Sequence, residues 1–248
     1  REKFPIFDSL AYGVVRGINP MLSPDERKDA IKGVPEGLAL LNELIDERRA
    51  TPGDDFLSTL ILAEDEGSKL SNLEMCALVG AVLGAGSDTA VDLHSYLIKN
   101  LLQHPDELDL LKSDPSLVQG AISETLRYES SGKTGLARYA SEDLEINGHF
   151  VKKGQMVQLI TSTAGMDSSI YSEPRKFDIQ RDHDKSISFG QGPHYCIGVT
   201  LVRSQTEVML KELFKRFPNL SLGDEIVYDY NHHNARRMDV MTVETRIS

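Results

Sequence analysis

The chain of 248 residues contains no tryptophan and only two cysteines, Cys76 and Cys196. Two thiols cannot build a disulfide framework or a four-cysteine zinc site, so a reducing, cytoplasmic compartment is the simplest setting. Long hydrophobic runs are also absent: residues 75–86 are apolar, but the run is too short to span a bilayer and ends at Ser87 and Asp88. No signal peptide is visible.

Basic residues are scarce relative to acidic ones. Lysine and arginine number 27 against 38 aspartates and glutamates, which gives a formal net charge of -11. Such a balance argues against broad binding to nucleic acid or to an anionic membrane. With 40% hydrophobic and 26% charged residues, the composition is otherwise ordinary for a globular protein with a substantial core.

Helical patterns dominate the chain, and strand patterns are confined to short stretches. A helix is predicted to start at Ser23, where Glu26 completes a capping box, and to be interrupted between Gly33 and Gly37 by Pro35. The fold class is therefore predicted to be mainly α with small β-sheets (α+β). The expected helices cover residues 23–49, 56–64, 71–103, 106–112, 117–128 and 201–217; the expected strands cover 136–140, 144–151 and 155–160 in one small sheet, with short strands in 220–247 around residues 231–234.

The most distinctive stretch runs from Ser188 to Gly198 and leads directly into the last predicted helix. Its three glycines let the backbone turn tightly and approach a large flat partner. The start of the following helix offers free N–H groups and a positive dipole end, which favour a thiolate at Cys196. Such a thiolate suits a single axial bond to a metal whose other ligands come from elsewhere, as in haem. The alternative is a glycine-rich loop around a core cysteine.

The spacing F-x-x-G-x-x-x-C-x-G in this stretch is met by Phe189, Gly192, Cys196 and Gly198. It resembles the haem-thiolate loop of the cytochrome P-450 superfamily. The resemblance implies a haem b cofactor (iron protoporphyrin IX), with Cys196 as the axial iron ligand and His194 bonded to a propionate. It further implies that Phe189, Gly190 and Gly198 contact the cofactor.

A second match lies in the predicted helix over residues 71–103, where Ala85-Gly86-Ser87-Asp88-Thr89 fits A-G-x-D-T. Interior glycines each cost about 1 kcal/mol against alanine, but they let a flat partner lie against the backbone. The resemblance implies a long, locally kinked helix over the distal haem face, with Ala85 at the cofactor and Asp88 and Thr89 as the catalytic acid–alcohol pair. A packing helix with surface polar residues is the alternative. A dinucleotide loop fits less well, because no strand precedes the glycines.

A third match is E-x-x-R at Glu124 and Arg127, whose spacing places both side chains on one helix face. Taken alone, the pair would be a solvated contact of little energetic worth. The resemblance implies a structural network behind the haem that includes a third arginine. Arg181 is the candidate for this position, and Arg175 is its rival.

The fourth match is Arg138 in R-x-A-x-E-D. Without the resemblance, this residue would be an exposed strand arginine. The resemblance implies that its guanidinium forks onto a haem propionate, a natural use of guanidinium against carboxylate.

The function implied is a monooxygenase that inserts one oxygen atom from O2 into a small apolar organic substrate. Its electrons would come from a ferredoxin or flavoprotein at the thiolate face, where Arg203, Lys211 or Lys215 could meet an acidic surface. Two alternatives stay open: a haem-thiolate enzyme that rearranges a peroxide without external electrons, and a truncated protein that only binds a ligand.

The extent of the chain bears on this function. Members of the superfamily are nearly twice as long, the four motifs match their C-terminal portion, and the first residue here is Arg1. We therefore expect residues 1–248 to form a single domain that is the C-terminal part of a haem domain whose N-terminal part is absent. We also expect the 248-residue chain alone not to be a competent monooxygenase.

Overall fold

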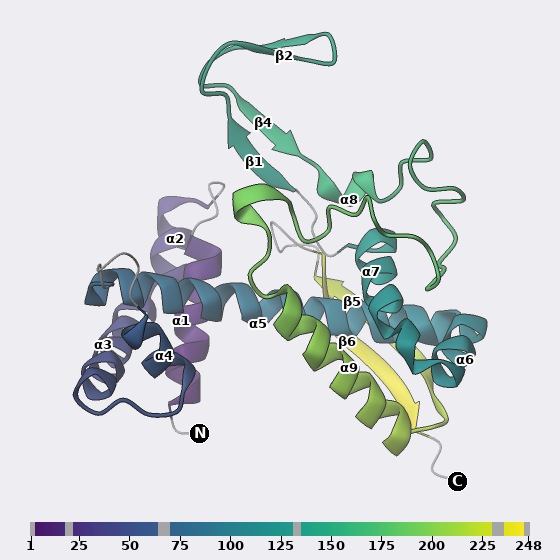
Figure 1. Ribbon diagram of the computed structural model, residues 1–248, viewed down its shortest axis with the longest axis horizontal. Helices are drawn as coiled ribbons and strands as arrows, with labels where there is room; N and C mark the ends of the chain where they lie inside the picture. The colour runs from purple at the N-terminus through teal and green to yellow at the C-terminus, as the bar shows by residue number, and fades with distance from the viewer. Residues whose placement is uncertain (1–2, 18–21, 64–69, 131–134, 230–235, 246–248) are drawn as a thin grey trace. The chain divides into compact units, whose positions relative to one another are not determined.

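A computed structural model describes residues 3–17, 22–63, 70–130, 135–229 and 236–245 (Figure 1). The chain divides into two compact units, residues 1–89 and 90–248, and the division falls within helix α5 (Asn72–Gln103). The two units are taken in turn below. The single-domain assignment of the sequence analysis stays a prediction.

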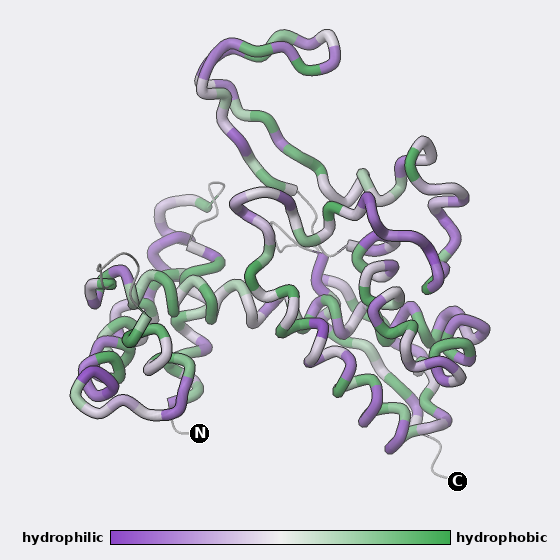
Figure 2. Tube along the Cα trace, in the orientation of Figure 1, coloured by the Kyte–Doolittle hydropathy of each residue, from purple (hydrophilic) through white to green (hydrophobic). Residues whose placement is uncertain are grey.

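The first unit is helical throughout its described part. It contains α1 (Phe4–Gly17), α2 (Pro24–Ala30), α3 (Val34–Ala50), α4 (Phe56–Leu62) and the first part of α5. Apolar and polar residues alternate along these helices (Figure 2), as expected for elements that bury one face. The core consists of Leu10, Leu41, Ile45, Ile61, Met75 and Cys76. Helix α1 had no counterpart among the predicted helices.

Local capping explains where the next helices begin. The Ser23 hydroxyl accepts from Glu26 N (3.3 Å) and Ser23 N donates to the Glu26 carboxylate (2.9 Å), which is the predicted capping box. The predicted interruption lies at residues 31–33, slightly before its expected place. Pro35 sits in the first turn of α3, so it starts a helix instead of breaking one, because its missing N–H has no partner to lose there.

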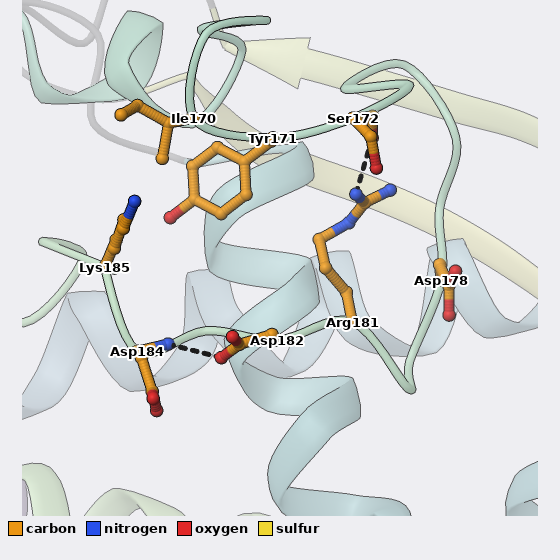
Figure 3. A pocket seen from close by; sticks show the side chains of 8 residues that line it. All are labelled: Ile170, Tyr171, Ser172, Asp178, Arg181, Asp182, Asp184 and Lys185. Atoms are coloured by element: carbon orange, nitrogen blue, oxygen red, sulfur yellow. Dashed lines mark hydrogen bonds between the residues drawn. The ribbon is translucent and has the colours of Figure 1, made fainter.

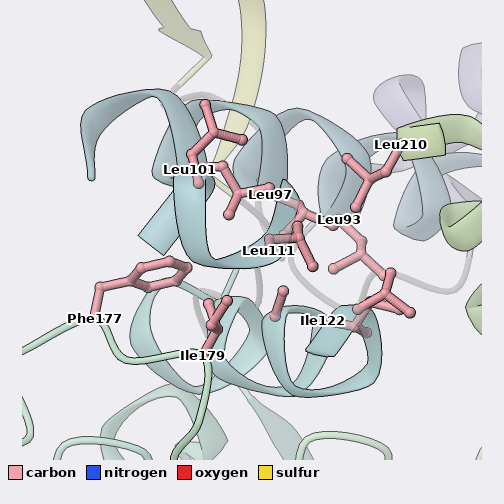
Figure 4. Packing of buried hydrophobic residues seen from close by; sticks show 11 residues of the cluster. Leu93, Leu97, Leu101, Leu111, Ile122, Phe177, Ile179 and Leu210 are labelled. Carbon is pink, nitrogen blue, oxygen red and sulfur yellow. The ribbon is translucent and has the colours of Figure 1, made fainter. Parts of the chain in front are cut away.

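The second unit is built around the remainder of α5, to which α6 (Pro105–Ser113), α7 (Val118–Tyr128) and α9 (Val199–Arg216) contribute core residues. Figure 4 shows the apolar contacts, including two residues from the irregular segment before the glycine-rich loop. The labelled members are Leu93, Leu97, Leu101, Leu111, Ile122, Phe177, Ile179 and Leu210. The irregular segment is thus anchored on the helices by its own apolar side chains.

The strands form antiparallel pairs. β1 (Leu136–Tyr139) pairs with β4 (Met156–Leu159), and β2 (Leu144–Ile146) pairs with β3 (His149–Val151). The expected single sheet over residues 136–160 is therefore wrong in detail, since these strands make two separate two-stranded ladders. Asn147 and Gly148, with φ of 48° and 82°, make the tight turn that joins β2 to β3.

A third pair closes the described part of the chain. β5 (Leu220–Asp229) pairs with β6 (Arg237–Thr245), as the strand patterns in 220–247 predicted. The expected connection around residues 231–234 lies outside the described residues. One short helix, α8 (Thr161–Ala164), falls where the sequence indicated the end of a strand and irregular chain. The fold class, mainly α with small β-sheets, is confirmed by the structure and by the solved structures it matches.

Helix α5 corrects one expectation. Among the described residues, this one helix is long and apolar enough to cross a membrane by length and composition, although no such run was expected. Its C-terminal half supplies Leu93, Leu97 and Leu101 to the core of the second unit, and core helices pass the same test. Length and composition therefore give no membrane assignment here.

Helices α5 and α9 are joined by a buried polar contact. His94 Nε2 lies 3.0 Å from Thr206 Oγ1, and the Thr206 hydroxyl donates to Val202 O at 2.6 Å. Because that hydroxyl proton is already used, His94 Nε2 must be the donor to Thr206. Burial lowers the pKa of His94, so the fold favours the neutral imidazole.

We predict a loss of stability in acid that depends on His94. Its pKa in the folded state lies below the unfolded value of about 6.5, so its contribution is present above that pH and is lost as the pH falls through the folded pKa. Urea unfolding between pH 8 and 5 should show a shallower acid slope in His94→Gln than in the parent. The exposed His149→Gln is the control and should keep the parent slope. An unchanged slope in His94→Gln would show that His94 does not titrate in this way.

Candidate functional site

The loop that carries Cys196 is closed by its own backbone. It contains the short 3₁₀ helix η2 (Gly192–His194), and Cys196 N donates to Phe189 O at 2.9 Å. Gly190 and Gly192 have φ of 75° and 68°, a region that residues with a Cβ rarely adopt. The glycines are therefore required by the turn itself.

The half-buried Cys196 thiol stands directly before α9. A Cβ built on Gly198 would lie 3.8 Å from Cys196 Sγ, so glycine keeps one side of the sulfur clear. Gly198 is also the N-cap residue of α9, and its carbonyl accepts from Val202 N at 2.9 Å. The sulfur thus lies at the end of a helix where backbone N–H groups lack intrahelical partners.

The donor set around the loop bears on which group could bind there. In the part of the chain that the structure describes, no group of three or more His, Cys, Asp or Glu side chains could hold a metal ion. A metal at Cys196 would therefore need most of its ligands from a cofactor. An iron porphyrin meets that condition, since its iron has four equatorial nitrogens and a free axial position.

The predicted propionate ligands, Arg138 and His194, are both exposed and lie in the same unit as Cys196. Arg138 projects from β1, opposite Val157, and its Nη1 donates to Ala137 O at 2.9 Å. A guanidinium has five N–H donors, so most of this group remains available to a carboxylate. The hydrogen-bond donors of these two residues fit a haem with two acidic side chains.

The predicted distal residues lie on α5 within the first unit, and α5 is α-helical without interruption from Asn72 to Gln103. Thr89 Oγ1 donates to Ala85 O at 2.6 Å, and both residues are exposed; Asp88 is half-buried. A Cβ on Gly84 would come within 3.2 Å of Val15, whereas a Cβ on Gly86 would meet nothing within 4 Å. Gly84 therefore serves packing against α1, and Gly86 is the glycine that leaves the helix surface open.

Glu124 is fully buried in α7 and is the centre of an ion-pair cluster. Arg127 binds it in a bidentate way, with Nε and Nη2 each 2.7 Å from a carboxylate oxygen. Arg181 Nε lies 3.3 Å from Glu124 Oε1, and Asp178 N donates to the same oxygen at 2.9 Å. The rival candidate, Arg175, is exposed.

Backbone carbonyls complete this cluster. Arg127 Nη1 donates to Gly165 O (2.7 Å) and Pro174 O (2.8 Å), while Arg181 Nη1 donates to Ser172 O (2.6 Å). Figure 3 shows the Arg181 guanidinium turned toward Ser172 at the edge of a surface pocket that also contains Tyr171. The two arginines hold the irregular segment in place, and their donors are occupied.

Two features of the second unit carried no signal in the sequence. His183 Nε2 lies 3.6 Å from Glu124 Oε2 at the edge of the ion-pair cluster. The Glu129 carboxylate binds both Lys99 and Arg236. These partners are 30 to 107 residues apart, so no local motif could have found them.

Comparisons with known proteins agree with this geometry. The cytochrome P-450 family model matches residues 112–226, which include Glu124, Arg138 and Cys196. The epothilone C/D epoxidase of Sorangium cellulosum is 40% identical over 246 residues, covering 98% of this chain and 58% of that protein. The 6-deoxyerythronolide B hydroxylase of Saccharopolyspora erythraea is 35% identical over 212 residues, covering 84% and 52%.

Solved structures give the same result. The chain superposes on the crystal structure of epothilone D-bound cytochrome P450epoK with a TM-score of 0.92 and 38% identity, covering all of this chain and 62% of that one. The chain thus spans about half the length of the curated relatives named above. The resemblance seen in the sequence is confirmed, and the chain belongs to the cytochrome P-450 family of haem proteins.

Proposed function

We propose that this chain is part of a haem-thiolate monooxygenase, which inserts one oxygen atom from O2 into an apolar organic substrate using external electrons. The observation that carries the proposal is the half-buried thiol of Cys196, presented by a closed glycine loop directly before α9. When bound, haem b supplies the iron at which dioxygen is activated, and a thiolate ligand favours O–O cleavage.

The residues of the second unit would hold and orient the cofactor. Cys196 would hold the iron through its sulfur, while Arg138 and His194 would donate hydrogen bonds to the two propionates. Phe189, Gly190 and Gly198 line the thiolate side, where small residues let the flat ring approach the backbone. Ala85, on the part of α5 that belongs to the first unit, stays a predicted cofactor contact.

Asp88 and Thr89 would deliver protons. The Thr89 hydroxyl donates its proton to Ala85 O, so its oxygen lone pairs can accept a hydrogen bond from water or a reacting group. The Asp88 carboxyl, next to it on the helix, would pass protons inward from solvent. General acid–base transfer of this kind contributes about 10²- to 10⁴-fold when the group is well placed.

The names of the two relatives favour oxygen insertion over peroxide rearrangement, because one is an epoxidase and the other a hydroxylase. The substrates in these two names are those of the relatives and are not assigned to this chain. For this protein we propose an apolar organic substrate and a cytoplasmic location.

The electron donor would be a ferredoxin or flavoprotein at the thiolate face. Lys211 and Lys215 are exposed on α9 and could meet an acidic partner surface. Arg203, the third candidate, is half-buried, and its guanidinium lies over the Phe189 ring, 5.5 Å from the ring centroid. It therefore packs against the cysteine loop and is less accessible to a partner protein. The lysines therefore make the better contact points.

The proposal is tested on the purified intact protein, since the 248-residue chain alone is expected not to be a competent monooxygenase; the protein is reduced and carbon monoxide is added. We expect the red-shifted Soret band of a thiolate-ligated haem, and substrate-dependent oxygen consumption that requires a ferredoxin or flavoprotein. A protein that turns over a peroxide equally well without any electron donor would support the rearrangement alternative instead.

Thr89→Ala tests the proton-delivery role. We expect intact haem binding, but electrons should be diverted to hydrogen peroxide, so that product per electron consumed falls by about tenfold or more. Ser87→Ala is the matched control, since Ser87 Oγ also donates to a carbonyl of the same helix, Gly84 O at 3.1 Å. Equal coupling in the Thr89→Ala and parent proteins would remove Thr89 from the mechanism.

A further inference from the structure

A small pocket lies beside the cysteine loop, entirely within the second unit. Three parts of the chain line it: α7, the segment around residues 183–189, and the loop with the start of α9. Its volume of about 270 Å³ is below the range of about 300–1,000 Å³ typical of sites for drug-sized organic ligands, so a small ion is the better fit. The lining residues are Ser123, His183, Asp184, Ser186, Ser188, Phe189, Tyr195 and Arg203.

Two of these side chains have buried polar atoms without a hydrogen-bond partner among the described residues. The His183 side chain is only 12% exposed and its ring nitrogens form no hydrogen bond, while Nε2 lies 3.6 Å from the Glu124 carboxylate. Arg203 Nε is also buried and unpartnered, while its guanidinium packs on the Phe189 ring. Buried donors in native proteins are nearly always satisfied, so a partner outside the polypeptide is expected.

The remaining polar groups of the lining are also mostly donors. Ser186 Oγ donates to Ser188 Oγ at 3.1 Å and accepts from Ser188 N at 3.3 Å, which leaves the hydroxyl protons of Ser123 and Ser188 for a ligand. The Arg203 guanidinium and one carboxylate, that of Asp184, also line the pocket. In the described part of the chain no set of three metal-ligating side chains is present here or elsewhere, which disfavours a cation.

We propose that this pocket is a binding site for a small tetrahedral oxyanion of the phosphate class. Arg203 supplies the fixed positive charge, and the hydroxyls of Ser123 and Ser188 donate to the oxygens of the anion. Ser188, Phe189 and Tyr195 belong both to the pocket lining and to the stretch that carries Cys196, so the site adjoins the proposed haem ligand and shares Phe189 with the proposed haem contacts.

The test is a calorimetric titration of the purified protein with inorganic phosphate, at an ionic strength held constant with chloride. We expect saturable binding of one phosphate per chain. Arg203→Gln should weaken it about tenfold or more, because a charge-assisted donor is lost. Arg216→Gln is the matched control on the same helix: Arg216 is exposed, pairs with Glu212, and should leave phosphate binding unchanged.

Three further titrations identify the ligand. Sulfate should compete with phosphate, acetate should bind more weakly, and phenyl phosphate shows whether the oxyanion enters alone or as the end of a larger ester. Heat that does not saturate, or equal weakening in Arg203→Gln and Arg216→Gln, would overturn the site. If Arg203→Gln does not fold, Ser123→Ala and Ser188→Ala replace it, and parent-like phosphate affinity in both would be equally decisive.

Discussion

Cys196→Ser should abolish the thiolate signature of the reduced, carbon monoxide-bound protein. Cys196 presents the only half-buried thiol of the chain, at the end of a closed glycine loop and directly before α9. A serine hydroxyl is a poor ligand for haem iron, so we expect the red-shifted Soret band to disappear and monooxygenase turnover to fall to the background rate. The absorbance spectrum of the purified variant measures this directly.

The chain provides its own control in the second cysteine. Cys76 is buried in the core of the first unit, where burial raises the pKa of its thiol, with the Asp46 carboxylate a smaller cause. Cys76→Ala should therefore keep the thiolate signature and lose only some stability. A red-shifted Soret band that survives in Cys196→Ser but is lost in Cys76→Ala would show that Cys76, and not Cys196, is the axial ligand.

Glu124→Ala should leave the protein poorly folded and without haem. The Glu124 side chain is 0% exposed, and its removal would leave Arg127, at 1% exposed, and Arg181, at 9%, with their charges uncompensated. Losing one partner of a buried ion pair typically costs about 3–5 kcal/mol. The free energy of unfolding of a whole protein is typically only about 5–15 kcal/mol, so this loss of stability is severe.

An exposed pair serves as the comparison for Glu124. Glu212 and Arg216 pair across one turn of α9 at 3.1 Å, and their side chains are 41% and 69% exposed. Glu212→Ala should change the free energy of unfolding by less than about 1 kcal/mol. If Glu124→Ala were as soluble, as haem-loaded and as stable to urea as Glu212→Ala, the Glu124 cluster would have no structural role.

The sequence predicted the features that depend on short-range chemistry. The predicted capping box at Ser23 is present, and the helix expected from residue 71 begins with the same arrangement, in which Glu74 binds Ser71 as Glu26 binds Ser23. The turn at Asn147 and Gly148 is present because both residues tolerate a positive φ. Spacing alone also indicated that Glu124 and Arg127 share a helix face.

The sequence could not predict what depends on distant segments. Nothing in E-x-x-R indicates that carbonyls of Gly165, Pro174 and Lys176 surround Arg127, because these lie 38 to 49 residues away. The unpartnered nitrogens of His183 depend on contacts made by the folded chain and have no local pattern. The pairing of β1 with β4 around the β2–β3 hairpin is likewise a matter of register, which alternation of residues does not fix.

The Glu124 cluster has a consequence for the order in which the chain folds. Helix α7 is built from local contacts, but Arg181 and the amide of Asp178 are 54 to 57 residues from Glu124 along the chain. Until that irregular segment returns, the Glu124 carboxylate must stay hydrated, since burying it early with Arg127 alone would leave both groups short of partners. Closing a loop of this length costs conformational entropy before its contacts form, whereas helix contacts are local. The loop that carries Cys196 follows this segment in the chain, so we expect its geometry to be acquired late, after the helices are in place.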